Sequence, residues 1–394
     1  MFKTSRHKAS AMTRVILWMG LPILLFTAVA AGFLALDPLR SLTSGVPPVE
    51  ALTIERTVLD GEGIALAVRA GGSEAMRIAQ VQVDGAYWAF TQDPPGALDR
   101  LQSARLQINY PWVQGETHHL TLVTSSGLTF EHTIDVATAT PTTSTGMIAK
   151  LGLIGVFVGV VPVALGMLFY PALRVGGGRA FQFALALTVG LLAFLLVDTL
   201  QEALELSSET APGLHGGVLV WLVAATTFAA LMAVGRRGGS LEGTALAAAI
   251  ALGIGLHNFG EGLAIGSAFA TGSAALGSFL VLGFTLHNLT EGIGIVAPMV
   301  RRRPSLWVFA ALAALAGLPA IAGVWLGSYA FSPHWAALAF AVGAGAILQV
   351  IVEVGGLLVR HGQREGHPWL SGAALAGAGS GTAVMYVTAL LVQV

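Results

Sequence analysis

The sequence predicts an α-helical polytopic membrane protein that carries a small extracytoplasmic β-sandwich domain. Three observations predict this class: only 10% of the 394 residues are charged, 55% are hydrophobic, and long apolar runs recur along most of the chain. A soluble protein usually has about a quarter of its residues charged, so this composition does not provide a water-facing surface. Soluble enzymes are therefore largely excluded.

The first element is an apolar run over residues 15–36, which comes after the basic residues Lys3, Arg6, Lys8 and Arg14. The run has roughly 20 residues, which is enough to cross a bilayer, whereas signal peptides have shorter apolar cores. Residues 28–30 resemble a cleavage site, so a cleaved signal peptide is the alternative. We expect residues 1–38 to form an N-terminal transmembrane anchor, and both interpretations export the segment after it.

Residues 42–143 have a different character, because they are polar and rich in Thr. Apolar and polar residues alternate over residues 52–58 and 130–136, and Gly and Pro separate such runs. Alternation with period two is typical of strands with one buried face. About seven short strands in roughly 100 residues predict a β-sandwich of the immunoglobulin-like kind. Residues 137–144, rich in Thr, are expected to form a linker.

Residues 147–394 form the predicted membrane body. Apolar runs recur about every 30 residues, which predicts eight spans here and nine with the anchor. Short cytoplasmic loops collect Lys and Arg. This rule assigns to the cytoplasm Arg174, Arg179, Arg236, Arg237, Arg301, Arg302, Arg303, Arg360 and Arg364. We therefore expect a protein of the plasma (inner) membrane with a cytoplasmic N-terminus, and with residues 42–143 and the C-terminus outside.

Two copies of one motif lie at bilayer depth, where an ionisable side chain costs at least about 2.5 kcal/mol. The pattern is His-Asn-x-x-Glu, and the copies are His257, Asn258, Glu261 and His287, Asn288, Glu291. His at i and Glu at i+4 project from one helix face, so two antiparallel neighbours can present two imidazoles and two carboxylates. These ligands would neutralise a divalent cation. The alternative is that the motifs only join helices through hydrogen bonds.

Further polar pairs lie in two other spans. Asp198 and Glu202 lie in the outer half of the second span, which predicts an access path; a solvated interfacial pair is the alternative. Gln349 and Glu353 lie in the seventh span, towards the cytoplasm, which predicts an exit path; a helix–helix hydrogen bond is the alternative. Histidines expected in loops or in residues 42–143 are left outside the site, among them His361 in an inner loop.

The composition limits which metal sites, cofactors and macromolecules the protein can have as partners. The chain has no cysteine, which excludes thiolate metal sites and Fe–S clusters, and its net charge of −1 without a basic stripe argues against nucleic acid. Imidazole prefers Zn²⁺, Fe²⁺ and Mn²⁺ to Mg²⁺ or Ca²⁺. We expect no prosthetic cofactor, a transported divalent metal (zinc first, then iron or manganese), and a lipid bilayer as the surroundings. The Gly-rich spans permit a homodimer.

These motifs resemble the signature of the ZIP (Zrt-, Irt-like protein) family of divalent-metal transporters. The resemblance covers about residues 147–394, with residues 257–266 similar to the fourth-helix signature and residues 287–292 similar to the fifth. It implies transport of Zn²⁺, Fe²⁺, Mn²⁺ or Cd²⁺ towards the cytoplasm by movement of spans one, four, five and six against the others. It also implies ligand roles by position: His257, Glu261, His287 and Glu291 around a primary ion, Asn258 and Asn288 near a second, and Asp198 and Glu202 as second-helix polar residues. Because Asn288 stands where the family often has an acid, we expect one strong ion site.

Two other functions would use the same residues. An intramembrane zinc-dependent hydrolase would hold zinc with His257 and His287 and use a glutamate as general base, but it usually needs a third histidine. A metal-occupancy sensor would bind the ion without transporting it. We expect a transporter and not an enzyme.

Overall fold

The computed structural model describes residues 20–33, 35–36, 49–175, 177–235, 241–270, 274–365 and 368–390. The chain divides into two units, Met1–Val49 and Glu50–Val394. In the first unit, Gly20–Phe33 forms a short apolar helix. The basic residues before it, and Arg236, Arg237 and His367 in the second unit, lie outside the described residues. The N-terminal anchor therefore stays a prediction.

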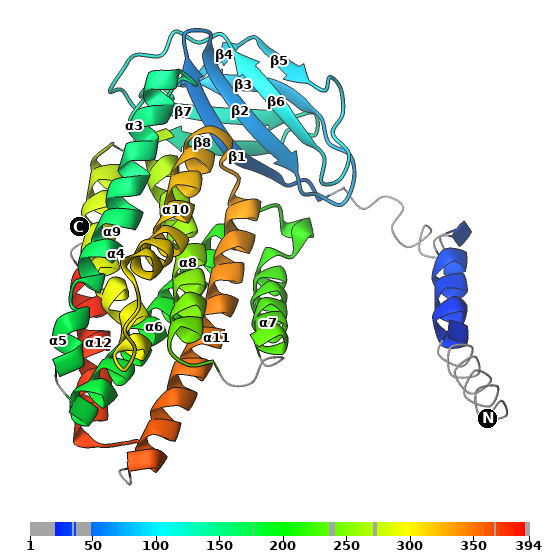
Figure 1. Ribbon diagram of the computed structural model, residues 1–394. Helices are drawn as coiled ribbons and strands as arrows, with labels where there is room; N and C mark the ends of the chain where they lie inside the picture. Colours follow the sequence, from blue (N-terminus) through cyan, green and yellow to red (C-terminus); the bar gives the residue numbers. More distant parts are fainter. Residues whose placement is uncertain are drawn as a thin grey trace, which may run out of the picture. The chain divides into compact units, whose positions relative to one another are not determined.

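Residues 50–137, which we call the β-domain, contain two antiparallel sheets of four strands each (Figure 1). One sheet has the order β1-β2-β6-β5, formed by Leu52–Asp60, Gly63–Ala70, Ser103–Ile108 and Phe90–Asp93. The other has the order β4-β3-β7-β8, formed by Ala86–Trp88, Ile78–Val83, His118–Thr124 and Thr129–Ile134. Where about seven strands were expected, eight are described, because β4 and β5 join different sheets although only Ala89 separates them.

Alternating side chains explain how the two sheets face each other. In β6, Leu106 and Ile108 are fully buried, and they share one hydrophobic core with Leu120 and Leu122 of β7 in the other sheet. The first sheet has the A-B-E-D strand order of the immunoglobulin fold, and the second has the C-F-G order with one added edge strand. Period-two patterning therefore places the apolar face of each strand between the sheets.

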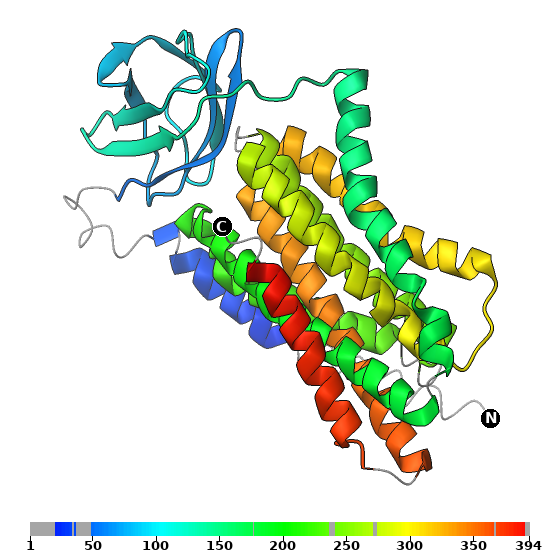
Figure 2. The ribbon, with the colours of Figure 1, turned by 90° about the vertical axis from the view of Figure 1, so that its left-hand side faces the viewer.

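The remainder of the second unit is a helical bundle (Figures 1 and 2). Eight helical stretches of the described chain are long and apolar enough to cross a membrane: Thr145–Val175, Gly177–Ser208, Pro212–Gly235, Thr244–Ala270, Leu276–Met299, Leu306–Ala330, Pro333–Arg364 and Gly372–Leu390. The first contains α3 (Thr145–Gly155), a π-helical segment (Val156–Val160), α4 (Val161–Met167) and α5 (Tyr170–Val175). The others contain α6 (Gly177–Ser208), α7 (Gly216–Gly235), α8 (Thr244–Ala270), α9 (Ala274–Val296), α10 (Leu306–Ala330), α11 (Pro333–Glu365) and α12 (Gly372–Leu390). The prediction of eight membrane-length apolar helices in the body is confirmed.

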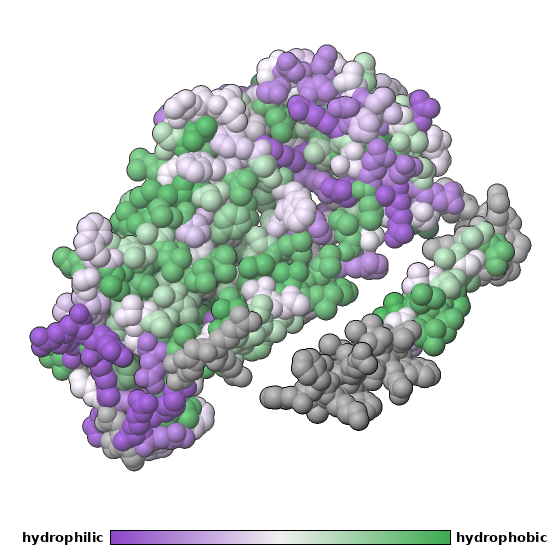
Figure 3. Space-filling model, turned by 45° about the vertical axis from the view of Figure 1, so that its right-hand side comes forward, coloured by the Kyte–Doolittle hydropathy of each residue, from purple (hydrophilic) through white to green (hydrophobic). Residues whose placement is uncertain are grey.

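The outer surface of the bundle is apolar. On the face drawn in Figure 3, hydrophobic residues cover most of the helices. On α7, Val218, Trp221 and Leu222 each expose more than half of their surface. Exposed apolar surface costs about 25 cal/mol per Å² in water, and large patches of it mark contact with lipid or another protein. The bundle is therefore suited to an integral, multi-pass membrane protein.

Close helix–helix contacts at glycines define two tightly packed groups of helices in the bundle. In the first, which we call the α8 group, a methyl group at Gly262 of α8 would collide with the backbone of Ala320 in α10, and one at Gly292 of α9 would collide with the backbone of Val163 in α4. Segment α3 joins α10 in the same way through Gly155. Such backbone contacts leave little freedom between helices, so α3, α4, α8, α9 and α10 form one body.

The second group, which we call the α6 group, comprises α6, α7, α11 and α12. A methyl group at Gly190 of α6 would collide with the backbone of Ala378 in α12, and one at Gly345 of α11 would collide with the backbone of Ala224 in α7. Contacts between the two groups involve side chains instead of close backbone approaches. A methyl group at Gly260 of α8 would collide with the ring of Phe340 in α11, whereas one at Gly343 of α11 would meet the carbonyl oxygen of Leu256 in α8 at the ordinary distance of 3.5 Å.

One loop prediction is wrong. His361 does not lie in an inner loop, because α11 continues to Glu365. Leu357 and Leu358 are buried in the hydrophobic core one turn earlier, which keeps this part of α11 folded against the bundle. His361 is 5% exposed, and its ring packs edge-on to Phe181 at 4.9 Å between centroids.

Candidate metal centre

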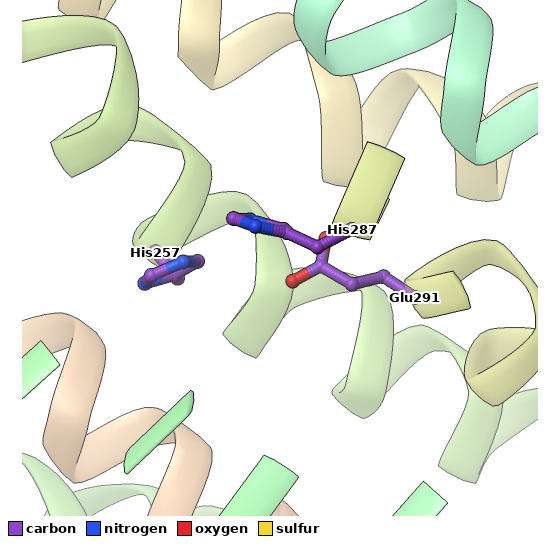
Figure 4. Close-up of side chains that lie close together, drawn as sticks. All are labelled: His257, His287 and Glu291. Atoms are coloured by element: carbon purple, nitrogen blue, oxygen red, sulfur yellow. The ribbon is translucent and has the colours of Figure 1, made fainter. Parts of the chain in front are cut away.

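Helices α8 and α9 bring the two motifs into one buried cluster. All six motif side chains are buried. Ligand atoms of His257, His287 and Glu291 lie within 4.8 Å of one another. Figure 4 shows these three side chains close together, with His257 on a helix adjacent to the one that carries His287 and Glu291. The i, i+4 spacing places the two α9 ligands on one face, as the motif predicts.

Glu261 lies between the two histidines. Its Oε1 is 3.0 Å from Nε2 of His257 and also contacts Nε2 of His287, and its Oε2 accepts a hydrogen bond of 3.0 Å from Nδ2 of Asn288. An unprotonated imidazole nitrogen and a carboxylate oxygen are both acceptors. Each hydrogen bond between Glu261 and a histidine therefore needs a proton on one of its two atoms. A cation that binds the same atoms must displace those protons.

The two asparagines donate their amide N–H groups to other helices. Nδ2 of Asn288 donates to the carbonyl of Val158 at 3.1 Å, and Nδ2 of Asn258 donates to the carbonyl of Ala316 at 3.1 Å. Pro162, four residues after Val158, has no N–H and so cannot make an α-helical hydrogen bond to the Val158 carbonyl. The bond from Asn288 connects α9 to the π-helical segment before α4.

Four buried oxygen atoms of the cluster have no hydrogen-bond partner among the described residues. They are Oδ1 of Asn258, Oδ1 of Asn288 and both carboxylate oxygens of Glu291. An unpaired buried polar atom costs about 1–3 kcal/mol. Oxygen donors beside two imidazoles suit zinc, iron or manganese, and a bound cation would satisfy these oxygens.

A cavity of about 690 Å³ reaches this cluster, and His257, Glu261 and His287 line it. Four carboxylates at intervals of three or four residues also line the cavity: Asp198, Glu202 and Glu205 of α6, and Glu209 just after the helix ends. The spacing places the three α6 carboxylates on one helix face. The predicted pair Asp198 and Glu202 therefore shares a cavity with both motif histidines.

Gln349 and Glu353 do not join this arrangement. Both are buried in α11, at 4% and 8% exposure, but neither lines the cavity or belongs to the cluster. Their neighbours Ile347, Val350 and Val354 belong to the main hydrophobic core. The structure thus does not bring the predicted exit-side pair to the metal ligands.

Sequence reasoning missed Thr199. Its Oγ1 lies 2.9 Å from Nδ1 of His257, and the residue is only 1% exposed. A partner on one ring nitrogen fixes the orientation of the imidazole, which leaves Nε2 for a metal. The sequence holds a signal for this role, since Thr199 follows Asp198 and lies three residues before Glu202 on an apolar helix.

Replacing Thr199 by valine is expected to weaken zinc binding by about 10- to 100-fold, because His257 loses its orienting partner while the side-chain shape is kept. Isothermal titration of the purified protein with zinc measures this. The control is Thr382→Val, which removes a hydroxyl of α12 that donates to the carbonyl of Gly190 in α6, at 3.2 Å, and that lines none of the described cavities. Equal affinities for Thr199→Val and Thr382→Val would exclude the positioning role.

No protein-family model matches the chain, and no curated protein matches it either. The function is therefore inferred from the residues of the cluster and their geometry.

Proposed function

We propose that this protein is a transporter that moves divalent transition-metal ions, zinc first and then iron or manganese, into the cytoplasm. The observation that carries the proposal is a buried cluster of two imidazoles and two carboxylates that a cavity reaches between apolar helices. Such ligands suit a borderline divalent cation. The resemblance of both motifs to the ZIP family supports the same function. Transport changes no covalent bond, so we assign no catalytic residue.

The proposed topology is based on the arginines. The described arginines of the helical bundle lie at one set of helix ends: Arg174, Arg179, Arg301, Arg302, Arg303, Arg360 and Arg364. We assign this side to the cytoplasm and the bilayer to the plasma (inner) membrane. In this assignment residues 1–38 are an anchor with a cytoplasmic N-terminus, residues 42–143 are exported, and the C-terminus lies outside.

The proposed path begins on the side of the β-domain, since residues 54–57 and His132 line the same cavity as the cluster. The carboxylates of α6 attract a cation, and the cluster then binds it by displacing the protons between Glu261 and the two histidines. Zinc binding is therefore coupled to proton release.

The two helix groups provide a way to change access. The α8 group carries both motifs, and the α6 group carries Asp198 and Thr199. Because backbone-to-backbone glycine contacts occur within the groups while the contacts between groups involve side chains, we propose that the α8 group moves as one body and carries the ion with it. The apolar core beyond the cluster must open during that movement.

The test is zinc uptake by proteoliposomes that contain the purified protein and a zinc-sensitive dye. We expect uptake with the wild-type protein, loss of uptake with the double variant His257→Ala/His287→Ala, and retained uptake with the control His334→Ala. His334 lies in the first turn of α11 and lines none of the described cavities. Undiminished uptake by the double variant would refute the site assignment.

The same assay separates the alternatives. Zinc binding without uptake by the wild-type protein would favour a metal-occupancy sensor. An intramembrane zinc-dependent hydrolase is less well supported, because the cluster contains two histidines and no third among the described residues.

A further inference from the structure

The β-domain forms part of the wall of the 690 Å³ cavity, through residues 54–57 of β1 and His132 of β8. A second cavity, of about 240 Å³, lies along β1, β8 and the end of α8. Three residues line both cavities: Thr57, His132 and Ala270. These residues therefore stand where the two cavities meet.

Thr57 and His132 present a hydroxyl and an imidazole at this junction. Oγ1 of Thr57 lies 2.9 Å from Nε2 of His132. Burial lowers the pKa of His132 below its ordinary value, and the carboxylate of Asp135 opposes this only in part. Imidazole nitrogen and hydroxyl oxygen are both donors that can bind a divalent metal ion.

Carboxylates continue from this junction to the cluster. The cavity that His132 lines also contains Glu209 and the α6 face formed by Glu205, Glu202 and Asp198. Glu205 and Asp198 are seven positions apart, which corresponds to about 10 Å along the helix axis. Thr199, next to Asp198, contacts His257. Oxygen and nitrogen donors thus extend from the β-domain to the motif histidines.

We propose that Thr57 and His132 form a transient binding site for a divalent metal ion, and that the β-domain is the outermost part of the transport path. The inference rests on the proposed transport function and deepens it, since it assigns the β-domain a direct role in capturing the ion. Both side chains offer neutral donors, so the ion is held weakly and moves on to the charged carboxylates of α6.

Arg56 also lines the cavity, and its positive charge has its own partners. Its guanidinium donates to the carbonyl of Ser328, at 3.2 Å, and to the carbonyl of Tyr329, both in the last turn of α10. The C-terminal carbonyls of a helix stabilise a cation. Arg56 therefore holds β1 against α10, and these carbonyls compensate its charge. The neighbouring residue Thr57 lines the cavity.

The absence of cysteine from the chain allows a direct test. The variant His132→Cys carries a single thiol, which a positively charged methanethiosulfonate reagent modifies. We expect the modification to block most zinc uptake by proteoliposomes, zinc present during the reaction to slow it, and a reducing agent to restore uptake. Restoration shows that the modified protein stayed folded. The control Gln80→Cys places a thiol on an exposed position of β3 that lines neither cavity.

A kinetic measurement accompanies the labelling. The variant His132→Ala is expected to raise the KM for zinc uptake about 10-fold while kcat is kept, because the capture site is lost and the cluster is intact. If wild-type uptake is normal and Glu261→Ala abolishes it, but modified His132→Cys and His132→Ala both behave like wild type, only this inference fails. If the wild-type protein takes up no zinc, the proposed function itself fails.

Discussion

Replacing Glu261 by alanine is expected to abolish zinc uptake and to weaken zinc binding by about two to three orders of magnitude. Glu261 contacts both motif histidines and Asn288, so its removal leaves three buried polar groups without their shared partner. Breaking a buried charged pair costs about 3–5 kcal/mol, and each 1.4 kcal/mol corresponds to a factor of ten in affinity. Fewer protons are also released on zinc addition, because the Glu261–histidine contacts that hold them are gone.

Isothermal titration, dye-based uptake and a pH indicator measure the three quantities on one preparation. The matched control is Gln182→Ala, which removes a buried polar side chain of α6 that bonds to Ser371 at 2.8 Å and lines none of the described cavities. This control is expected to lower thermal stability and to keep zinc affinity. A Glu261→Ala protein that still binds zinc with wild-type affinity would contradict the assignment of the cluster.

The substitution Gly323→Ala is expected to destabilise the protein by about 1–3 kcal/mol and to disturb the cluster, although Gly323 contacts no ligand. A methyl group here would collide with the carbonyl of Phe259 and lie 3.0 Å from the Cα of Gly262, next to Glu261. The two backbones must separate, and α8 is displaced at the motif. Thermal unfolding in detergent and zinc affinity are expected to fall together.

Gly343→Ala is the control for this prediction. Gly343 is also a buried glycine at a helix contact, but a methyl group there meets the Leu256 carbonyl at the ordinary distance of 3.5 Å. Its thermal unfolding is expected to resemble that of the wild type. If Gly323→Ala unfolds at the wild-type temperature, α8 and α10 are not held together as tightly as the glycine contacts indicate.

Much of the fold can be predicted from local sequence pattern. Strand alternation predicted a core between two sheets, and apolar runs predicted the eight membrane-length helices of residues 147–394. Helix ends were harder to predict. At His361 the sequence turns polar, yet α11 continues because its preceding turn is buried in the core. A helix boundary depends on such contacts as well as on local composition.

For the buried cluster too, the local pattern predicted some features and missed others. The repeated His-Asn-x-x-Glu pattern led us to expect that His257 and His287 face each other, and the structure places them with Glu291 in one cluster. The pattern did not indicate that Thr199 contacts His257 or that Asn288 donates to Val158. Both contacts join helices that are distant in the chain, and a threonine or asparagine in a span has many alternative partners.

The sequence by itself predicted the eight membrane-length helices that the described part of residues 147–394 contains, and it singled out two histidines and two glutamates as candidate metal ligands. Helical and strand periodicity are local properties, so residue spacing alone reveals them. Only the tertiary structure decided which helices form the two groups and that Gln349 and Glu353 lie away from the cavity. It also decided that Thr57 and His132 help to line that cavity. Those features arise from close approaches between small residues, and one glycine in a span resembles another until its neighbour is known.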